Sequence, residues 1–233
     1  MNSRKKTARM AGFLYLMFLV TLIFAEDAVR SKLIVFGDGA ATANNIMASE
    51  GLFRIGFMSD LLSAVFFLLS AWALHVLLKS VDKNLALLFV LLILGGVAIH
   101  CINMLNQFAA LLLLSGADYL KVFQAVQLQA LAMLFLNLYK NGFIIAQVFY
   151  GAWLFPLGYL VFKSGFLPRI LGILLMIDCF GVLIWFFQFF LFPGYEVITY
   201  PGLIVSLIAE FSLALWLLIM GAKDQKPASI EAS

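Results

Sequence analysis

The sequence predicts an all-α fold, a polytopic transmembrane helical bundle with six spans. Of its 233 residues, 64% are hydrophobic and only 12% are charged, whereas soluble domains average about 45–50% and about 25%. Long apolar segments also recur along the whole chain, without the alternation of period 2 that is typical of a membrane β-barrel. Because backbone amides in hydrocarbon must be bonded within their own segment, each segment is expected to be helical.

Six segments meet the length of about 20 apolar residues that a span requires. They cover about 10–25, 52–78, 85–114, 142–162, 170–192 and 203–221. These spans leave no room for a soluble domain. We therefore expect residues 1–233 to form a single integral membrane domain that ends in a polar cytoplasmic tail at 222–233.

The first segment begins with basic residues, as a signal peptide does. The place where cleavage would fall reads Ile23-Phe24-Ala25, which is not the small-x-small pattern of a cleavage site. We therefore expect this segment to stay in the protein as its first helix.

The segment 121–139 is apolar enough to suggest a seventh span, but it contains three glutamines. A seventh span would move Lys163 and Arg169 to the outer side of the membrane. We therefore predict an amphipathic outer helix that leads into the fourth span, or one long bent fourth helix. Pro156 within the fourth span predicts a kink.

The distribution of basic residues predicts the orientation, because cytoplasmic loops carry an excess of Lys and Arg. A cytoplasmic start leaves few of them outside: Arg30, Lys32, Lys121 and Lys140, with Arg54 just within the second span. It collects the larger group inside: Arg4, Lys5, Lys6, Arg9, Lys79, Lys83, Lys163, Arg169, Lys223 and Lys226. Both termini are predicted to be cytoplasmic.

Several polar side chains fall within the spans, where an ionisable group costs about 2.5–3.5 kcal/mol on insertion scales. They turn three helices polar in the outer half of the membrane and place carboxylates deeper in the last two, where a lone carboxylate is neutral unless it is paired. The candidate ligand-binding residues are Arg54, Asp60, His100, Asn103, Gln107, Lys140, Gln147, Asp178 and Glu210. A hydrated cavity open to the outside, or a closed hydrogen-bond network, would explain them. Glu210 is the first choice among them.

Simpler roles compete with ligand binding at these positions. Asn, Gln and His within spans often join helices to one another, and Arg54 can extend its charged end to the headgroups. Cys101 and Cys179 are expected to be packing residues. The sequence has no His-Glu-x-x-His pair, no Gly-x-Ser-x-Gly elbow, and neither a phosphate-binding nor a dinucleotide motif. We therefore predict no catalytic residue, metal or cofactor, and the scattered basic residues give no support for nucleic-acid binding.

Three stretches carry a resemblance to a known family: Val148 to Tyr159, Lys163 to Gly172 with its Ser-Gly-Phe-Leu-Pro-Arg sequence, and Ala209 to Leu218. In these stretches the chain resembles the bacterial multi-pass membrane family catalogued as domain of unknown function 4386. The resemblance implies a six-helix prokaryotic protein of the bacterial inner (plasma) membrane and brings no activity or catalytic residue with it. Many members have Gly before the glutamate that aligns with Glu210, where this chain has Ala209.

The leading functional hypothesis is the binding or transport of a small molecule through an outward-facing polar cavity. One alternative is a structural or accessory subunit, in which the same groups only tie helices together. A second is an intramembrane enzyme that acts on a lipid-linked substrate, with His100 or Asp60 as the base. The expected partners are membrane lipids, a small-molecule ligand, and another membrane protein or a second copy of the chain.

Overall fold

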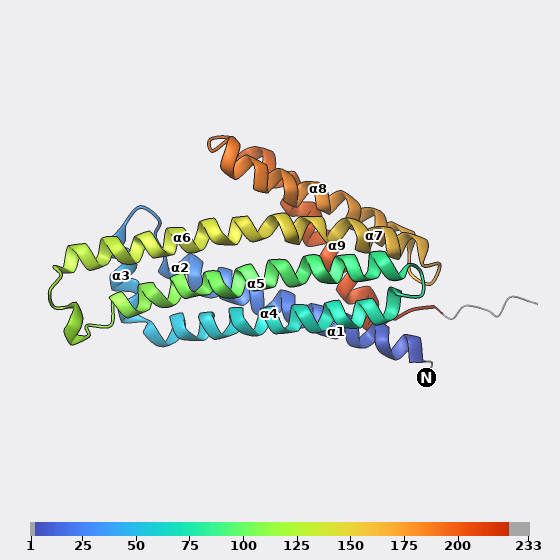
Figure 1. The fold of residues 1–233 in the computed structure, drawn as a ribbon, viewed down its shortest axis with the longest axis horizontal. Helices are drawn as coiled ribbons and strands as arrows, with labels where there is room; N and C mark the ends of the chain where they lie inside the picture. The colour runs from blue at the N-terminus through green and yellow to red at the C-terminus, as the bar shows by residue number, and fades with distance from the viewer. Residues whose placement is uncertain (1–2, 224–233) are drawn as a thin grey trace, which may run out of the picture. The chain divides into compact units, whose positions relative to one another are not determined.

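The computed structural model describes residues 3–223, and its regular elements are helices throughout that range. Figure 1 follows the chain through them. The longer helices are α1 (Ser3–Ile23), α3 (Gly39–Ala48), α4 (Glu50–Leu78), α5 (Lys83–Leu113), α6 (Ala125–Ala152), α7 (Leu154–Lys163), α8 (Arg169–Leu191) and α9 (Tyr200–Ile219). The short elements are η1 (Phe24–Arg30), α2 (Ser31–Leu33), η2 (Asp118–Leu120) and η3 (Glu196–Thr199).

Within residues 3–223, six helical stretches are long and apolar enough to cross a membrane. They are Ser3–Leu33, Glu50–Leu78, Lys83–Leu113, Ala125–Lys163, Arg169–Leu191 and Glu196–Ile219. The predicted fold class, an all-α membrane bundle with six spans, is therefore confirmed.

The first span is longer than the sequence indicated. Helix α1 continues without a turn through η1, a π-helical stretch, into α2 and ends at Leu33. Glu26 and Asp27 do not end the helix, because the Glu26 carboxylate accepts a hydrogen bond from Arg30 Nε at 2.8 Å. Opposite charges four residues apart support a helix in this way.

Of the two alternatives predicted for 121–139, the structure has the second, because residues 125–139 belong to the fourth span. Helices α6 and α7 together cover Ala125–Lys163, which confirms the long fourth helix. The two are separated at Trp153, three residues before Pro156. Proline has no backbone N–H, so Pro156 cannot bond the carbonyl of Ala152. Regular bonding resumes at Leu157, whose N–H donates to the Trp153 carbonyl at 3.2 Å.

The chain forms two compact units, and each is described by itself. Unit 1 takes the described residues of Met1–Leu16, Leu69–Leu92 and Gly151–Ser233, and unit 2 takes Met17–Leu68 and Ile93–Tyr150. The expectation of a single membrane domain stays a prediction.

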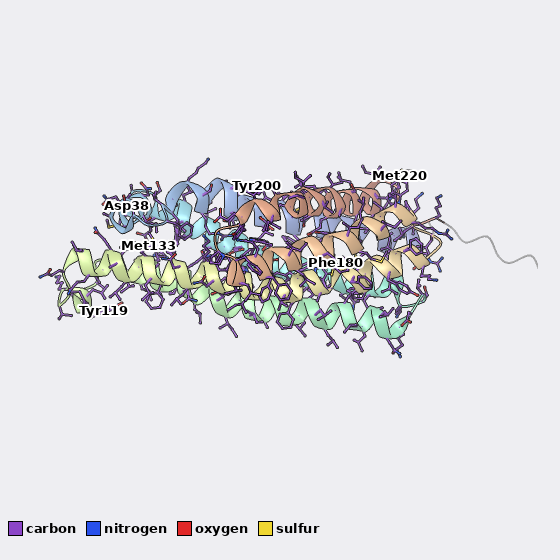
Figure 2. The ribbon with its side chains drawn as sticks, turned by 90° about the horizontal axis from the view of Figure 1, so that it is seen from above. Asp38, Tyr119, Met133, Phe180, Tyr200 and Met220 are labelled. Carbon is purple, nitrogen blue, oxygen red and sulfur yellow. The ribbon has the colours of Figure 1, made fainter. Side chains whose placement is uncertain are left out.

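The core of unit 2 joins the end of the first span to α3, α4, α5 and α6. Its buried members are Val29, Leu33, Ile34, Ile46, Phe53, Ala110, Leu111, Ala132 and Leu136. Helices α5 and α6 run side by side (Figure 1), and Gly96 lets them approach, since a Cβ there would lie 2.6 Å from the Tyr150 ring. At one end of this unit, Asp38 caps α3 by accepting from the Ala41 N–H at 2.8 Å. Figure 2 shows Asp38 and Tyr119 toward that same end.

Unit 1 is held together by close approaches at glycines. A Cβ added at Gly181 on α8 would lie 2.9 Å from the Cα of Gly202 on α9. A Cβ at Gly158 on α7 would lie 2.7 Å from the Gly172 carbonyl oxygen on α8. Small residues allow membrane helices to pack backbone against backbone, which is what these pairs do.

Candidate functional site

The candidate site is built around Asp60 of α4, whose side chain is completely buried. Its Oδ2 atom lies 2.8 Å from Arg30 Nη1, at the end of η1. The same oxygen accepts a hydrogen bond of 2.9 Å from the hydroxyl of Tyr139 on α6. An ion pair and a phenol donor thus meet on one carboxylate oxygen.

Helix α5 supplies two more groups to the same carboxylate. His100 Nε2 lies 3.2 Å from Asp60 Oδ1, and Gln107 Nε2 donates to Oδ2 over a longer 3.4 Å. The spacing of seven residues puts both side chains on one face of α5. We call Arg30, Asp60, His100, Gln107 and Tyr139 the Asp60 centre.

The tautomer of His100 follows from its partner. A carboxylate only accepts hydrogen bonds, so Nε2 carries the hydrogen that faces Asp60. In the neutral ring, Nδ1 is then an acceptor. Within residues 3–223 this buried nitrogen has no hydrogen-bond partner.

Arg30 links the buried centre to an exposed acid. Its side chain is 5% exposed, while the side chain of its second partner, Glu26, is 57% exposed. The guanidinium carbon also lies 5.2 Å from the centre of the Tyr139 ring, in a cation–π contact. The positive charge is therefore shared between two carboxylates and an aromatic face.

A further set of contacts fixes α5 against α6 beside the centre. The Asn103 side chain donates to the Tyr139 carbonyl at 2.7 Å, and Asn106 donates to the Asn103 side-chain oxygen at 3.0 Å. The amide of Asn103 lies directly against Gly142, where no side chain fits. The Phe143 ring meets the His100 ring nearly edge-on, with centroids 5.8 Å apart. These contacts set the position from which Tyr139 and His100 reach Asp60.

The structure brings part of the predicted site together. Asp60, His100 and Gln107 meet directly, and Asn103 supports them from the same face of α5. Their role in binding a ligand stays a prediction.

Three other candidates of the same unit lie elsewhere. Arg54 pairs with Glu50 on its own helix at 2.7 Å, and its side chain is 55% exposed. Lys140 is exposed and lies over the ring of Phe36, 4.8 Å from its centre. Gln147 is buried on α6.

Comparison with known proteins places the chain in a family. The family model described as "Domain of unknown function (DUF4386)" matches residues 10–221. The chain belongs to this family. It is also similar to an "Uncharacterized protein" from Archaeoglobus fulgidus, with 38% identity over 79 residues, which is 34% of this chain and 46% of that relative. The matching part thus spans less than half of the relative's length. No solved structure matches the chain.

Two members of the Asp60 centre in this DUF4386 protein were not predicted from the sequence. Arg30 was assigned to an outer loop because the first span was expected to end near residue 25, and Tyr139 fell in a segment predicted as an amphipathic outer helix or as part of a long bent fourth helix. The spacing of Glu26 and Arg30 was the signal for the first, because an opposite-charge pair four residues apart indicates a continuing helix. Nothing near Tyr139 in the sequence marks it.

The two deep carboxylates of this DUF4386 protein belong to unit 1 and form a second polar group. Glu210 on α9 accepts hydrogen bonds from the Tyr15 hydroxyl at 2.7 Å and from the Ser206 hydroxyl at 3.3 Å. Asp178 on α8 is fully buried. The sequence predicted both as ligand-binding residues, with Glu210 first, and that role stays a prediction.

Proposed function

We propose that this DUF4386 member binds or transports a small molecule across the membrane, with the Asp60 centre as its polar site. One observation carries the proposal: a fully buried aspartate is contacted by four polar side chains from three other helical segments. We also propose that the site faces outward, with both termini cytoplasmic in a bacterial inner (plasma) membrane.

The energetic cost of the Asp60 centre supports a role in ligand binding rather than a role only in holding the helices together. Each ionisable group in a span costs about 2.5–3.5 kcal/mol on insertion scales. A hydrogen bond between membrane helices returns on average about 0.6 kcal/mol. Apolar side chains would join these helices at lower cost, so a separate role explains why Arg30, Asp60 and His100 stand here.

His100 indicates what kind of ligand would fit. Its Nδ1 atom is buried, is an acceptor in the neutral ring, and lacks a partner within the described chain. A hydroxyl or ammonium group of a small molecule would satisfy it. The proposed ligand is therefore a small polar molecule that carries a hydrogen-bond donor.

The depth of Asp60 supports the outward orientation. It lies ten residues after Glu50, the first residue of α4, and eighteen before Leu78, the last. At ~1.5 Å per residue these separations are roughly 15 Å and 27 Å. With a cytoplasmic N-terminus and one preceding span, the end of α4 near Glu50 is the outer one.

A thermal-shift screen tests the proposal with the purified full-length protein in detergent. The probes are a panel of small amines, amino alcohols and sugars, applied to wild type, Asp60→Asn and, as the matched control, Glu50→Gln at an exposed acid of the same helix. A ligand present at 100 times its Kd stabilises the folded state by about 2.7 kcal/mol. We expect at least one probe to raise the Tm of wild type and of the control, and to leave that of Asp60→Asn unchanged. Equal shifts in all three proteins, or none in wild type, would remove the Asp60 centre as a ligand site.

A structural or accessory role is the second candidate, and one observation favours it. Both oxygens of Asp60 already have donors from the chain itself, so the centre also resembles a closed tie between helices. On this alternative, Asp60→Asn lowers the Tm without any probe, and no probe distinguishes it from wild type.

A further inference from the structure

The register of α8 against α9 determines which side chains face each other. The two helices approach most closely at Gly181 and Gly202. They run antiparallel, because η3 and the short turn before it reverse the chain between them. Moving three residues back along α8 reaches Asp178, and moving four forward along α9 reaches Ser206. These two residues therefore face each other one turn from the glycine contact.

Asp178 is an unusual group in this position. Its side chain is fully buried, and within residues 3–223 neither carboxylate oxygen has a hydrogen-bond partner. The register of the two helices places Ser206 opposite Asp178, and Ser206 in turn donates to Glu210 one turn farther along α9. A buried carboxylate with no firm donor is unfavourable as an anion.

Glu210 has the opposite environment. It is one turn beyond Ser206 on the same face of α9, and it accepts from both Ser206 and Tyr15. Tyr15 is held there because α1 packs closely on α9 at Gly12, where a Cβ would lie 2.7 Å from the Ala214 carbonyl oxygen. Two hydroxyl donors stabilise a carboxylate in its charged form.

The protonation of Asp178 and Glu210 depends on the side chains around them. Tyr15 donates to Glu210 from α1, Ser206 donates to Glu210 from α9, and Cys179 follows Asp178 on α8. Neither acid belongs to one of the ion pairs described above. Two adjacent carboxylates in a medium of low polarity do not both ionise without a cation.

We propose that Asp178 and Glu210 form a one-proton site, in which Asp178 is a carboxylic acid and Glu210 a carboxylate. Exchange runs through Ser206 once the Asp178 hydroxyl has turned toward it: the Asp178 O–H bond breaks as its proton passes to Ser206 Oγ, while the Ser206 hydroxyl proton passes to Glu210. The net change moves one proton from α8 to α9. If the protein transports a small molecule, this proton could move together with it, and that step depends on the function proposed above. The one-proton site does not depend on that function.

Infrared spectroscopy of the purified full-length protein in lipid vesicles tests the site without any ligand. The carbonyl stretch of a protonated carboxyl group is measured at neutral pH in wild type, Asp178→Asn, Glu210→Gln and the control Glu196→Gln, an exposed acid of the same unit. We expect the band in wild type, Glu210→Gln and the control, and its loss in Asp178→Asn. A band that persists in Asp178→Asn would overturn the proposal.

Two further measurements, isotope labelling and sodium addition, complete the test. Carbon-13 aspartate is incorporated into the wild type, so the band must shift if it belongs to an aspartic acid, even if Asp178→Asn fails to fold. Sodium ions are added at constant pH, and a band that disappears would show that a metal cation occupies the pair instead. If probes bind at the Asp60 centre but the protein shows no aspartic acid band, only the proton site is refuted. If the band is present but no probe binds, only the ligand site is refuted.

Discussion

At the scale of single residues, the strongest interaction of the Asp60 centre is the buried pair of Arg30 and Asp60, 2.8 Å apart. Removing one partner of a buried ion pair leaves an uncompensated charge, which costs about 3–5 kcal/mol. We therefore expect Arg30→Met to lower the free energy of unfolding in detergent by about that amount. Arg54→Met, which breaks the exposed pair with Glu50, is the control and is expected to cost at most about 1 kcal/mol.

The double variant Arg30→Met with Asp60→Leu separates charge from packing. Replacing both charges with apolar groups of similar size is often neutral or stabilising, so the double variant should be more stable than Arg30→Met alone. The same equilibrium unfolding measurement decides this. A double variant that loses as much as the sum of the two single changes would mean that the pair is not coupled.

Tyr139 offers a finer test, because its hydroxyl and its ring have separate partners. Tyr139→Phe removes the donor to Asp60 but keeps the ring against Arg30. A hydrogen bond to a charged group contributes about 1.5–3 kcal/mol, and we expect a loss in that range by chemical unfolding. Tyr119→Phe, at a highly exposed residue of η2, should change nothing, and equal effects at the two positions would contradict this role.

At the scale of elements, the sequence predicted the number of spans but not where two of them end. Hydropathy located the apolar interior of each helix, since that signal depends only on side-chain type. It placed the end of the first span near residue 25 because Glu26 and Asp27 look like a boundary, although a salt bridge allows the helix to continue. The glutamines of 124–129 similarly left two alternatives open for this segment, an interfacial helix or a long fourth helix, and α6 begins at Ala125.

The candidate site was predictable to the same partial extent. The stripe of His100, Asn103 and Gln107 follows helical spacing and did converge on α6 and on Asp60. Which long-range partner each residue meets depends on the packing of helices far apart in the chain, and one sequence contains no record of that. Arg30 and Tyr139 were missed because the segments that hold them were not recognised as parts of long spans, while Arg54 lies exposed near the N-terminal end of α4.

The contact between α8 and α9 gives a prediction at this scale. A methyl group on Gly202 would lie 2.9 Å from the Cα of Gly181, so Gly202→Ala must separate the two backbones. Overpacking of this kind costs typically about 1–3 kcal/mol. We expect a lower Tm for Gly202→Ala and no change for Gly194→Ala, whose added Cβ meets nothing within 4 Å. Equal Tm values for the two variants would contradict the close approach.

At the scale of the whole molecule, the predicted orientation in the membrane depends on where the basic residues lie. Basic residues lie in the first turns of the first span, between the second and third spans, and on both sides of the turn between the fourth and fifth spans, and they are expected to stay on the cytoplasmic side. A fluorescent protein fused to the C-terminus should therefore fluoresce. Alkaline phosphatase inserted after Tyr119, between α5 and α6, should be active because that connection is predicted to lie outside. An active phosphatase at the C-terminus would reverse the topology and place the Asp60 centre nearer the inner surface.

The π-helical stretch Phe24–Arg30 has a consequence for how the length of this chain can vary. A π turn accommodates one residue more than an α turn, so it absorbs an insertion without rotating the residues that follow it. Loss of one residue within Phe24–Val29 would convert the stretch to ordinary α-helix and leave Arg30 opposite Asp60. The same deletion farther back, at Val20, would turn the guanidinium away from its carboxylate by about 100°. Relatives of different lengths are thus expected to differ here and to keep the rest of the first helix in phase.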